Sequence, residues 1–451
     1  MTVNTERQAR LQAAITRGDR ESTIETLRLL AGSGELADHL RGLTRAQLAR
    51  LADVLGDETI GEFLGELDPY DAAAILQRLT AADAADVLEA MEPDEAADVV
   101  GEFAPSDADR ILIEMEPVEA AELRELLSYP PDTAGGRMTP AFISIRPDLR
   151  ADQAIVALRR VAEEAETITY FYVTDADDHL LGVLSLRKLV LSPPTTPVAE
   201  LLDTGLITVL ATADQEVAAK LLTENNLLAL PVVDRDGRIL GIITADDVAD
   251  ILEQETTEDI ERLGGSAPLE EPYLRATPTH LWRKRVGWLL ALFLAEAYTG
   301  TVLRHYEEEM SAVIALTFFV PLLIGTGGNV GSQVVVTLVR AMALGQVRLR
   351  DIFRIILKEA QTGVMLGVVM AAATFIRAMT LGVGVDVGMT VAIAVAAIVI
   401  WAAFVGAVLP LVLHRLGVDP AVVSTPFITT LVDGTGLIIY FTVARMILHL
   451  G

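Results

Sequence analysis

The stretch Thr425–Phe441, TPFITTLVDGTGLIIYF, is apolar enough for a membrane helix yet carries one carboxylate, Asp433. A carboxylate at the centre of a spanning helix costs about 2.5–3.5 kcal/mol on insertion scales, so it usually faces a partner, a cavity or an ion path. With Thr425 as N-cap and Pro426 at the first helical position, Asp433 lies roughly 12 Å inside the helix start. This depth is near the middle of a hydrocarbon layer about 30 Å thick. The sequence therefore predicts that Asp433 has a functional or structural role at the centre of this helix.

A polar stripe runs along the same predicted helix. At helical spacing one face carries small and polar side chains, namely Thr425, Thr429, Asp433, Gly436 and Tyr440. Such a stripe is suited to lining a pore. The alternative is a carboxyl group held in an interhelical hydrogen bond, and the pattern leaves both open.

Working outward, the hydropathy pattern predicts five membrane spans. They are approximately Leu281–Leu303, Ser311–Leu338, Phe353–Phe375, Val385–Leu413 and Pro426–Leu448. Basic residues precede span one, lie between spans two and three, and precede span five: Arg283, Lys284, Arg285, Arg340, Arg348, Arg350, Arg354 and Arg415. Because such loops stay on the cytoplasmic side, we expect cytoplasmic N-terminal domains and an external C-terminus.

The charge is divided very unevenly along the chain. From Val286 onward there are 9 acidic and 9 basic residues, and subtraction from 63 and 35 leaves 54 acidic against 26 basic before it. The N-terminal part thus carries the whole net charge of −28. Such a surface repels nucleic acid and attracts cations, although acidic residues also serve solubility. The absence of cysteine excludes disulfides and thiolate metal sites.

A 12-residue repeat dominates the N-terminal part from Leu43 onward. Its clearest units begin at Leu67-Asp-Pro, Leu79-Thr-Ala, Met91-Glu-Pro, Phe103-Ala-Pro and Met115-Glu-Pro. Residues before the first helical position and acids three residues later resemble capping boxes, so each unit is predicted to be a short helix. Stacked units of this kind form an all-α superhelix. Capping explains many of the carboxylates, so only some are free to bind cations.

Two copies of a strand–turn–strand–helix unit follow, offset by 59 residues. Phe171–Ser185 aligns with Leu230–Thr244, and an Asp-rich turn joins the two strands of each copy. This pattern resembles a tandem pair of CBS domains. The resemblance implies an α/β regulatory module that can bind an adenosine nucleotide such as ATP.

The nucleotide-site residues follow from that resemblance and from side-chain chemistry. Thr244 and Asp247 match the Ser/Thr-x-x-Asp step whose Asp holds the ribose, whereas the first copy departs from it with Lys188 three residues after Ser185. Tyr170 is a candidate to stack on adenine and Arg187 to pair with a phosphate. An ordinary strand aromatic is an equally good interpretation of Tyr170.

Two further features of the membrane part stand out. The run Gly325–Gln333 permits close helix packing and places Asn329 and Gln333 on one face. Glu296 in span one is a second carboxylate that is expected to be buried, as a structural group or a relay.

The order of these segments resembles the MgtE family of magnesium channels and transporters. It implies a multidomain chain: an all-α superhelical N domain, an α/β tandem CBS pair, an acidic linker helix and an α-helical membrane domain with five transmembrane helices. The expected boundaries are 1–130, 131–252 with copies at 138–193 and 198–252, 253–272, and 273–451. The resemblance also implies a plasma-membrane homodimer in a lipid bilayer, with Asp433 of each subunit facing hydrated Mg²⁺ and Thr425 and Thr429 beside it.

Carboxylates that repel one another until Mg²⁺ bridges them would make a sensor. We expect cytosolic Mg²⁺ to close the pore through Glu95, Glu216, Asp247, Asp250, Glu258, Asp259 and Asp419. One alternative is a proton-coupled transporter of Mg²⁺ or another divalent cation, with Glu296 or Asp433 as relay. Another is a membrane-anchored nucleotide sensor. The sequence has no HExxH motif and its six histidines are scattered, so we expect no enzyme.

Overall fold

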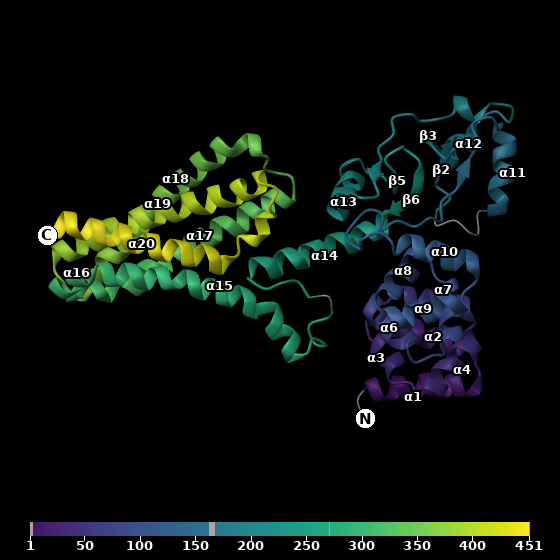
Figure 1. The fold of residues 1–451 in the computed structure, drawn as a ribbon, viewed down its shortest axis with the longest axis horizontal. Helices are drawn as coiled ribbons and strands as arrows, with labels where there is room; N and C mark the ends of the chain where they lie inside the picture. Colours follow the sequence, from purple (N-terminus) through teal and green to yellow (C-terminus); the bar gives the residue numbers. More distant parts are fainter. Residues whose placement is uncertain (1–2, 162–166, 270, 451) are drawn as a thin grey trace. The chain divides into compact units, whose positions relative to one another are not determined.

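The computed structural model describes residues 3–161, 167–269 and 271–450 (Figure 1). The chain forms two compact units that are divided between Glu253 and Gln254. We refer to them as unit 1 and unit 2. Unit 1 contains the repeats and the strands, and unit 2 contains the long apolar helices.

Unit 1 starts with a series of short helices. They are α1 (Val3–Arg17), α2 (Arg20–Ala31), α3 (Leu36–Arg41), α4 (Arg45–Leu55), α5 (Asp57–Gly65), α6 (Pro69–Leu76), α7 (Ala81–Glu89), α8 (Pro93–Gly101), α9 (Pro105–Glu114) and α10 (Pro117–Leu126). From α6 to α10 each helix begins 12 residues after the previous one, which confirms the predicted repeat. Alternate helices pack on one another, α6 on α8, α7 on α9 and α8 on α10, so the units stack into a superhelix.

The predicted caps are only partly present. Thr80 and Asp83 bond each other's backbone N–H in a complete capping box, and Asp68 accepts from the N–H of Tyr70. Glu92 and Glu116 occupy N-cap positions without a side-chain cap bond. The longer Glu side chain suits this position poorly, because the short acceptors Ser, Thr, Asp and Asn reach the N2 and N3 amides best.

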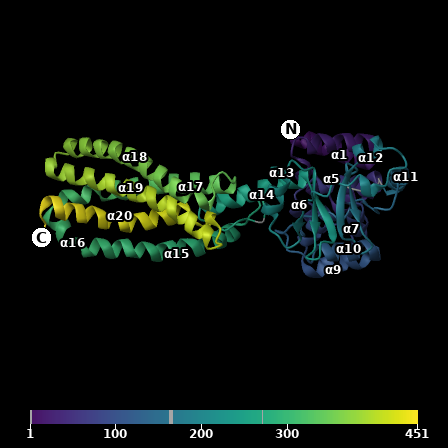
Figure 2. The same ribbon diagram turned by 90° about the horizontal axis from the view of Figure 1, so that it is seen from above.

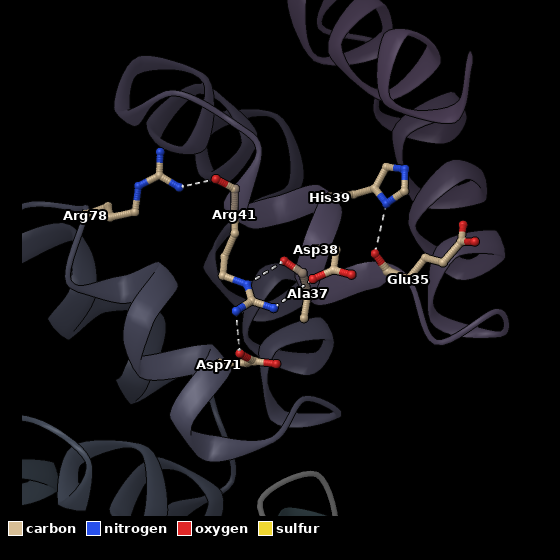
Figure 3. A network of polar contacts seen from close by, with 7 residues as sticks. All are labelled: Glu35, Ala37, Asp38, His39, Arg41, Asp71 and Arg78. Atoms are coloured by element: carbon tan, nitrogen blue, oxygen red, sulfur yellow. Dashed lines mark hydrogen bonds and ion pairs between the residues drawn. The ribbon is translucent and has the colours of Figure 1, made fainter. Parts of the chain in front are cut away.

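A buried ion pair ties α3 to α6 (Figure 3). The guanidinium of Arg41 lies 3.2 Å from Asp71 Oδ1 and 2.9 Å from Asp38 Oδ1. Arg78 in turn donates to the carbonyl oxygen of Arg41 over 2.8 Å. Asp71 is only 5% exposed, so this capping-box position of the repeat is used here to hold neighbouring turns of the superhelix together.

The two CBS copies have the same topology. The first comprises β1 (Ser144–Ile145), α11 (Ala151–Val161), β2 (Tyr170–Thr174), β3 (Leu180–Ser185) and α12 (Leu186–Leu191), and the second comprises β4 (Val209–Leu210), α13 (Gln215–Glu224), β5 (Ala229–Val233), β6 (Ile239–Thr244) and α14 (Ala245–Leu263). In each sheet the first two strands are parallel and the last two antiparallel. Tyr170 pairs with Ser185 and Ala229 with Thr244, so the predicted offset of 59 residues is confirmed at the level of strand register.

Unit 2 is a helix bundle (Figures 1 and 2). Among the described residues, five helical segments are long and apolar enough to cross a membrane, which confirms the predicted number. They are α15 (Pro278–His305), η2 (Ile314–Phe319) with α17 (Val320–Ala343), η3 (Leu349–Asp351) with α18 (Ile352–Thr380), α19 (Val385–Arg415) and α20 (Thr425–Leu448). The short helix α16 (Glu307–Ala312) separates the first two.

Close approach between α17, α19 and α20 depends on glycine. A Cβ at Gly327 would lie 2.7 Å from both Ile398 on α19 and Val432 on α20, and one at Gly328 would lie 2.8 Å from Thr429. The glycines of the Gly325–Gln333 run therefore allow close helix packing, as the sequence predicts. The buried core of unit 2 centres on α19, which packs against α17, α18 and α20.

Candidate cation sites

Asp433 lies deep in unit 2, on α20. Its side chain is 7% exposed, and its Oδ1 is buried with no hydrogen-bond partner among the residues that the structure describes. The next residue, Gly434, packs against Tyr298 and Thr299 of α15, and the hydroxyl of Thr299 is also buried without a hydrogen-bond partner there. An interhelical hydrogen bond to Asp433 Oδ1 is thus absent from the described part of the chain. A buried acceptor of this kind is costly unless something else satisfies it.

The remainder of the predicted stripe has mixed surroundings. Thr429 is half-buried against Gly328, and its hydroxyl donates to the carbonyl oxygen of Thr425 over 3.1 Å. Tyr440 is fully buried and donates to the carbonyl oxygen of Leu316 over 2.9 Å. The C-terminal part of the stripe therefore packs inside unit 2, which makes the sequence interpretation of Tyr440 as a pore-lining residue wrong.

Two sequence expectations about these helices need correction. The N-cap of α20 is Ser424, whose hydroxyl accepts from the N–H of Phe427, and Thr425 is the first helical residue. Ser424 and Thr425 both have a hydroxyl that can cap a helix, and α20 begins one residue earlier than the Thr-Pro pair indicates. Glu296 is exposed on the surface of the single chain, so the expected burial is wrong. Within the single chain α15 packs mainly against α20, so most of its surface stays uncovered. The hydropathy pattern of the sequence does not report this limited packing.

The second face of α17 is polar. Gly325, Asn329 and Gln333 are exposed and follow one another at helical spacing, while Gly327 and Gly328 point at the neighbouring helices. The predicted placement of Asn329 and Gln333 on one face is confirmed. A polar exposed face on a membrane helix indicates contact with water or with another protein surface.

Carboxylates from distant parts of unit 1 gather beside the N-terminus of α14. Burial, and then the charge of Asp247, raises the pKa of Asp94 to about 7. Burial, and then the charges of Glu92, Asp94 and Asp247, raises the pKa of Glu95 to about 8. Burial raises the pKa of Asp247 to about 6, although the Thr244 backbone N–H and hydroxyl donate to it over 2.8 and 2.9 Å. We call Asp94, Glu95 and Asp247 the interdomain cluster.

The interdomain cluster brings together Glu95 and Asp247 as the sequence predicted, and it adds Asp94, which the sequence reasoning missed. Asp94 Oδ1 is buried and has no hydrogen-bond partner within the described ranges, so it has an unused acceptor for a cation. The side chain of Glu95 lies against Gly65 of α5, where no Cβ is present to displace it. These donors are hard oxygens, which suit Mg²⁺.

An arginine lies at the next contact between the helical repeats and the CBS pair. Arg137 donates to Asp98 Oδ2 over 2.8 Å and to Gln215 Oε1 over 2.9 Å. Burial raises the pKa of Asp250, as does the charge of Glu253, and the positive charge of Arg137 partly offsets them. Glu216, which follows Gln215, is exposed at the start of α13. The charges that shift the pKa of Asp250 are thus those of Glu253, Arg137 and Asp246, none of which belongs to the interdomain cluster.

A second group of carboxylates occurs within unit 2. Arg262 forms ion pairs with Glu258, one turn earlier on α14, and with Asp419 in the loop before α20. Burial, and then the charge of Asp419, raises the pKa of Asp259. The structure thus gathers Glu258, Asp259 and Asp419 as the sequence predicted. The arginine at their centre was not predicted.

The candidate nucleotide residues are divided between the two CBS sheets. In the first, Tyr170 is the first residue of β2 and Arg187 lies on α12, and in the second, Thr244 is the last residue of β6 and donates its N–H and its hydroxyl to Asp247 on α14. Ser185, at the position that matches Thr244, caps α12 by accepting from the N–H of Lys188. Asp247 is a candidate for both kinds of site, since it belongs to the interdomain cluster and also matches the Asp of the Ser/Thr-x-x-Asp step that holds the ribose.

A compact group of ligand-type atoms in the β2–β3 turn is structural. Asp175 accepts from the N–H groups of Asp177 and His179 over 2.9 and 3.0 Å. In the second copy Asp234 makes the same two bonds to Asp236 and Arg238. Because an arginine replaces His179 there, the shared feature is the Asx turn and not a ligand set.

The fold and these sites define a multi-span membrane protein whose helical and CBS domains carry clustered carboxylates. Family comparison agrees. A model described as "Divalent cation transporter" matches residues 320–443, one for the "MgtE intracellular N domain" matches residues 32–132, and CBS-domain models match residues 134–192 and 198–254.

Individual relatives extend the match. The magnesium transporter MgtE of Thermus thermophilus is 43% identical over 329 residues, or 73% of each chain, and that of Enterococcus faecalis is 36% identical over 331 residues, covering 73% of this chain and 72% of that one. A crystal structure of the soluble part of a magnesium transporter matches with a TM-score of 0.50 and 30% identity, covering 56% of this chain and 98% of that one. The chain belongs to the MgtE family of magnesium transporters. Its function is Mg²⁺ transport, which is not an enzymatic kind of function.

Proposed function

We propose that the chain is a Mg²⁺-selective channel of the plasma membrane that works as a homodimer. Its pore lies between the membrane domains of two copies, with Asp433 of each facing a hydrated Mg²⁺. The buried Oδ1 of Asp433, which lacks a hydrogen-bond partner in the described chain, carries this proposal. A second copy supplies what one chain lacks, because two carboxylates across a dyad match the charge of the ion.

The chemistry of Mg²⁺ favours a site with few protein ligands. The ion dehydrates reluctantly, so carboxylate, hydroxyl and carbonyl oxygens around its water shell are sufficient. Thr425 and Thr429 supply hydroxyl and carbonyl oxygens on the N-terminal side of Asp433. The exposed polar face of α17 with Asn329 and Gln333 is the second wall of the path. In the single chain Thr425 and Thr429 are half-buried and Asn329 and Gln333 are exposed, so both walls offer polar groups that a second copy can face.

We further propose that cytosolic Mg²⁺ closes the channel. In this proposal unit 1 lies in the cytosol and the C-terminus outside, an orientation that the basic loops support. We assign the regulatory site to the interdomain cluster because burial and mutual repulsion raise the pKa values of its carboxylates, and because Asp94 Oδ1 accepts no hydrogen bond from the described residues. A divalent cation that binds the ionised form relieves the repulsion between them. Glu216 and Asp250 form an outer part of the same acidic surface.

The linker helix connects this sensor to the membrane domain. Glu258, Asp259 and Asp419 gather at the C-terminal end of α14 and the loop before α20. In our proposal Mg²⁺ binds these carboxylates too, and it clamps α14 in the closed state. An adenosine nucleotide such as ATP binds between the CBS sheets through Tyr170, Arg187, Thr244 and Asp247.

The test uses the purified full-length protein in liposomes. Single-channel currents carried by Mg²⁺, which fall as internal Mg²⁺ rises, are the expected result. Flux that needs a pH gradient and shows no unitary currents would instead support the proton-coupled alternative, for which Glu296 on α15 is the second available carboxylate. Flux that is indifferent to internal Mg²⁺ would contradict the sensor.

A further inference from the structure

The N-cap of α20 is held by a second helix. The hydroxyl of Ser424 accepts from the N–H of Phe427 over 3.3 Å and from the indole N–H of Trp288 over 2.9 Å. Ser424 is 1% exposed, so water does not replace either donor. The first turn of α20 therefore depends on one hydroxyl, and α15 fixes the position of that hydroxyl.

The same indole contacts the end of the linker helix. Gly265, two residues after α14, has φ +78°, and a Cβ there would lie 3.0 Å from Cδ1 and 3.2 Å from Nε1 of Trp288. It would also lie 3.4 Å from Cγ of Pro426, the second residue of α20. The backbone at Gly265 is thus pressed against both Trp288 and the start of α20.

Further contacts fix this segment within unit 2. Leu263 packs on the buried core of the bundle, and the N–H of Ala267 donates to the carbonyl oxygen of Lys284 on α15 over 3.0 Å. Arg262 reaches Asp419, whose other oxygen accepts from the N–H of Ala421 just before α20. Residues 262–267 consequently touch α15 and the start of α20, and they cannot shift without moving one of them.

We infer that Trp288 is a positioning residue that couples the end of α14 to the N-cap of the pore helix. This inference rests on the proposed function, in which α20 lines the ion path. An α-helix is stiff over the roughly 12 Å between its first turn and Asp433, so a displaced cap moves the carboxylate with it. Trp288 touches no ion in this account. It transmits the position of the linker through the Nε1–Oγ bond and the contact with Gly265.

Trp288→Phe is the central variant, because it keeps an aromatic ring and removes the N–H donor. Trp401→Phe is its matched control, since Trp401 donates to Thr435 Oγ1 over 2.9 Å in the middle of α20. Trp282→Phe alters the remaining tryptophan, which is 62% exposed on α15. In Mg²⁺ uptake by liposomes, Trp288→Phe should shift the internal Mg²⁺ concentration for half-closure at least about threefold, and neither control should do so.

A second pair of variants leaves Trp288 in place. Gly265→Ala introduces a Cβ at a positive φ against the indole, whereas Gly264→Ala meets only carbonyl oxygens of its own helix. We expect the Gly265 variant to shift half-closure and the Gly264 variant to match the unmodified protein. This pair keeps the inference testable if Trp288→Phe does not fold.

A readout independent of transport separates this inference from the proposed function. Hydrogen–deuterium exchange of the first turn of α20, residues 425–428, should accelerate in Trp288→Phe and stay unchanged in Trp282→Phe. If the unmodified protein is not closed by internal Mg²⁺, the proposed gating fails and exchange alone decides the role of Trp288. Unchanged half-closure together with unchanged exchange in Trp288→Phe would overturn the inference.

Discussion

Arg262 and Asp419 form an ion pair with 2.6 Å between Nη1 and Oδ2, and the same guanidinium also pairs with Glu258. The arginine therefore lies between the carboxylates that we propose as a Mg²⁺ site, with Asp259 beside them. Mg²⁺ and the Arg262 guanidinium would compete for the carboxylate oxygens of Glu258 and Asp419. The pair suggests that Arg262 sets how much Mg²⁺ is needed for closure.

Replacing this arginine tests the competition. In Arg262→Met, Glu258, Asp259 and Asp419 lose their countercharge, so Mg²⁺ should bind more tightly and half-closure should occur at an internal concentration lower by about threefold to tenfold. Mg²⁺ uptake by liposomes loaded with graded internal Mg²⁺ measures this shift. Arg354→Met removes the same charge from an exposed position on α18 and should have little effect. An unchanged or higher half-closing concentration in Arg262→Met contradicts the competition.

The interdomain cluster should make stability depend on pH. The pKa values of Asp94, Glu95 and Asp247 are raised to about 7, 8 and 6, whereas an unfolded chain has carboxyl pKa values near 4. Between about pH 4 and pH 8 the folded state binds more protons, so the free energy of unfolding falls as pH rises when divalent cations are absent. Mg²⁺ binds the ionised carboxylates, so its stabilising effect should be larger at about pH 8 than at about pH 6.

Thermal unfolding with and without saturating MgCl₂ at both pH values measures this effect. The triple variant Asp94→Asn, Glu95→Gln, Asp247→Asn serves as the control, because it should lose most of the pH dependence of the Mg²⁺ effect. A Mg²⁺-induced shift in melting temperature that is equal at both pH values in the unmodified protein would argue against a regulatory site at the interdomain cluster.

Gly65 tests the position of Glu95. A Cβ at Gly65 would overlap the Glu95 carboxylate, so Gly65→Ala should displace that carboxylate and raise the Mg²⁺ concentration for half-closure at least about threefold. Gly101 is the matched control, since it also ends a helix and a Cβ there would lie 4.0 Å from Leu127. Isothermal titration of both variants with Mg²⁺ measures the difference. Equal Mg²⁺ affinity in the two variants would show that Glu95 is not a ligand.

A buried ion pair should stabilise the end of the bundle remote from the linker. Glu309 is 5% exposed and pairs with Arg445, whose guanidinium lies 4.9 Å from the ring centroid of Tyr306. Arg445→Met leaves a buried carboxylate without its partner and should lower the free energy of unfolding by about 2–4 kcal/mol. Unfolding in detergent measures this, with Arg377→Met on the exposed side of α18 as control. The double variant with Glu309→Gln should recover part of the loss, and an additive result would contradict the pairing.

Features that depend on local spacing were predictable from the sequence. The helix starts from Pro69 to Pro117 follow the 12-residue repeat, and the two CBS hairpins follow the offset of 59. The five spans follow from length and apolarity. In each case the signal lies within a few turns of helix or one hairpin, where the physics of capping, alternation and burial is local.

Features that depend on docking were not predictable. Asp94 looks like an ordinary acid in the first turn of α8, where a negative charge is favourable in any helix. Its relation to Asp247 exists because the helical repeats pack on the second CBS copy, and no spacing within either segment reports that contact. Arg262 likewise looks like a basic residue suited to the end of α14. Only the folded chain shows that it reaches Asp419.

In the proposed channel Mg²⁺ passes Asp433, and flux of Mg²⁺ into liposomes containing the Asp433→Ala protein tests this most directly. Internal Mg²⁺ should be chelated so that the channel is open, and Asp386→Ala in the first turn of α19 serves as a matched carboxylate control. We predict flux indistinguishable from protein-free liposomes for Asp433→Ala and near-normal flux for the control. Undiminished flux through a folded Asp433→Ala protein would contradict the account.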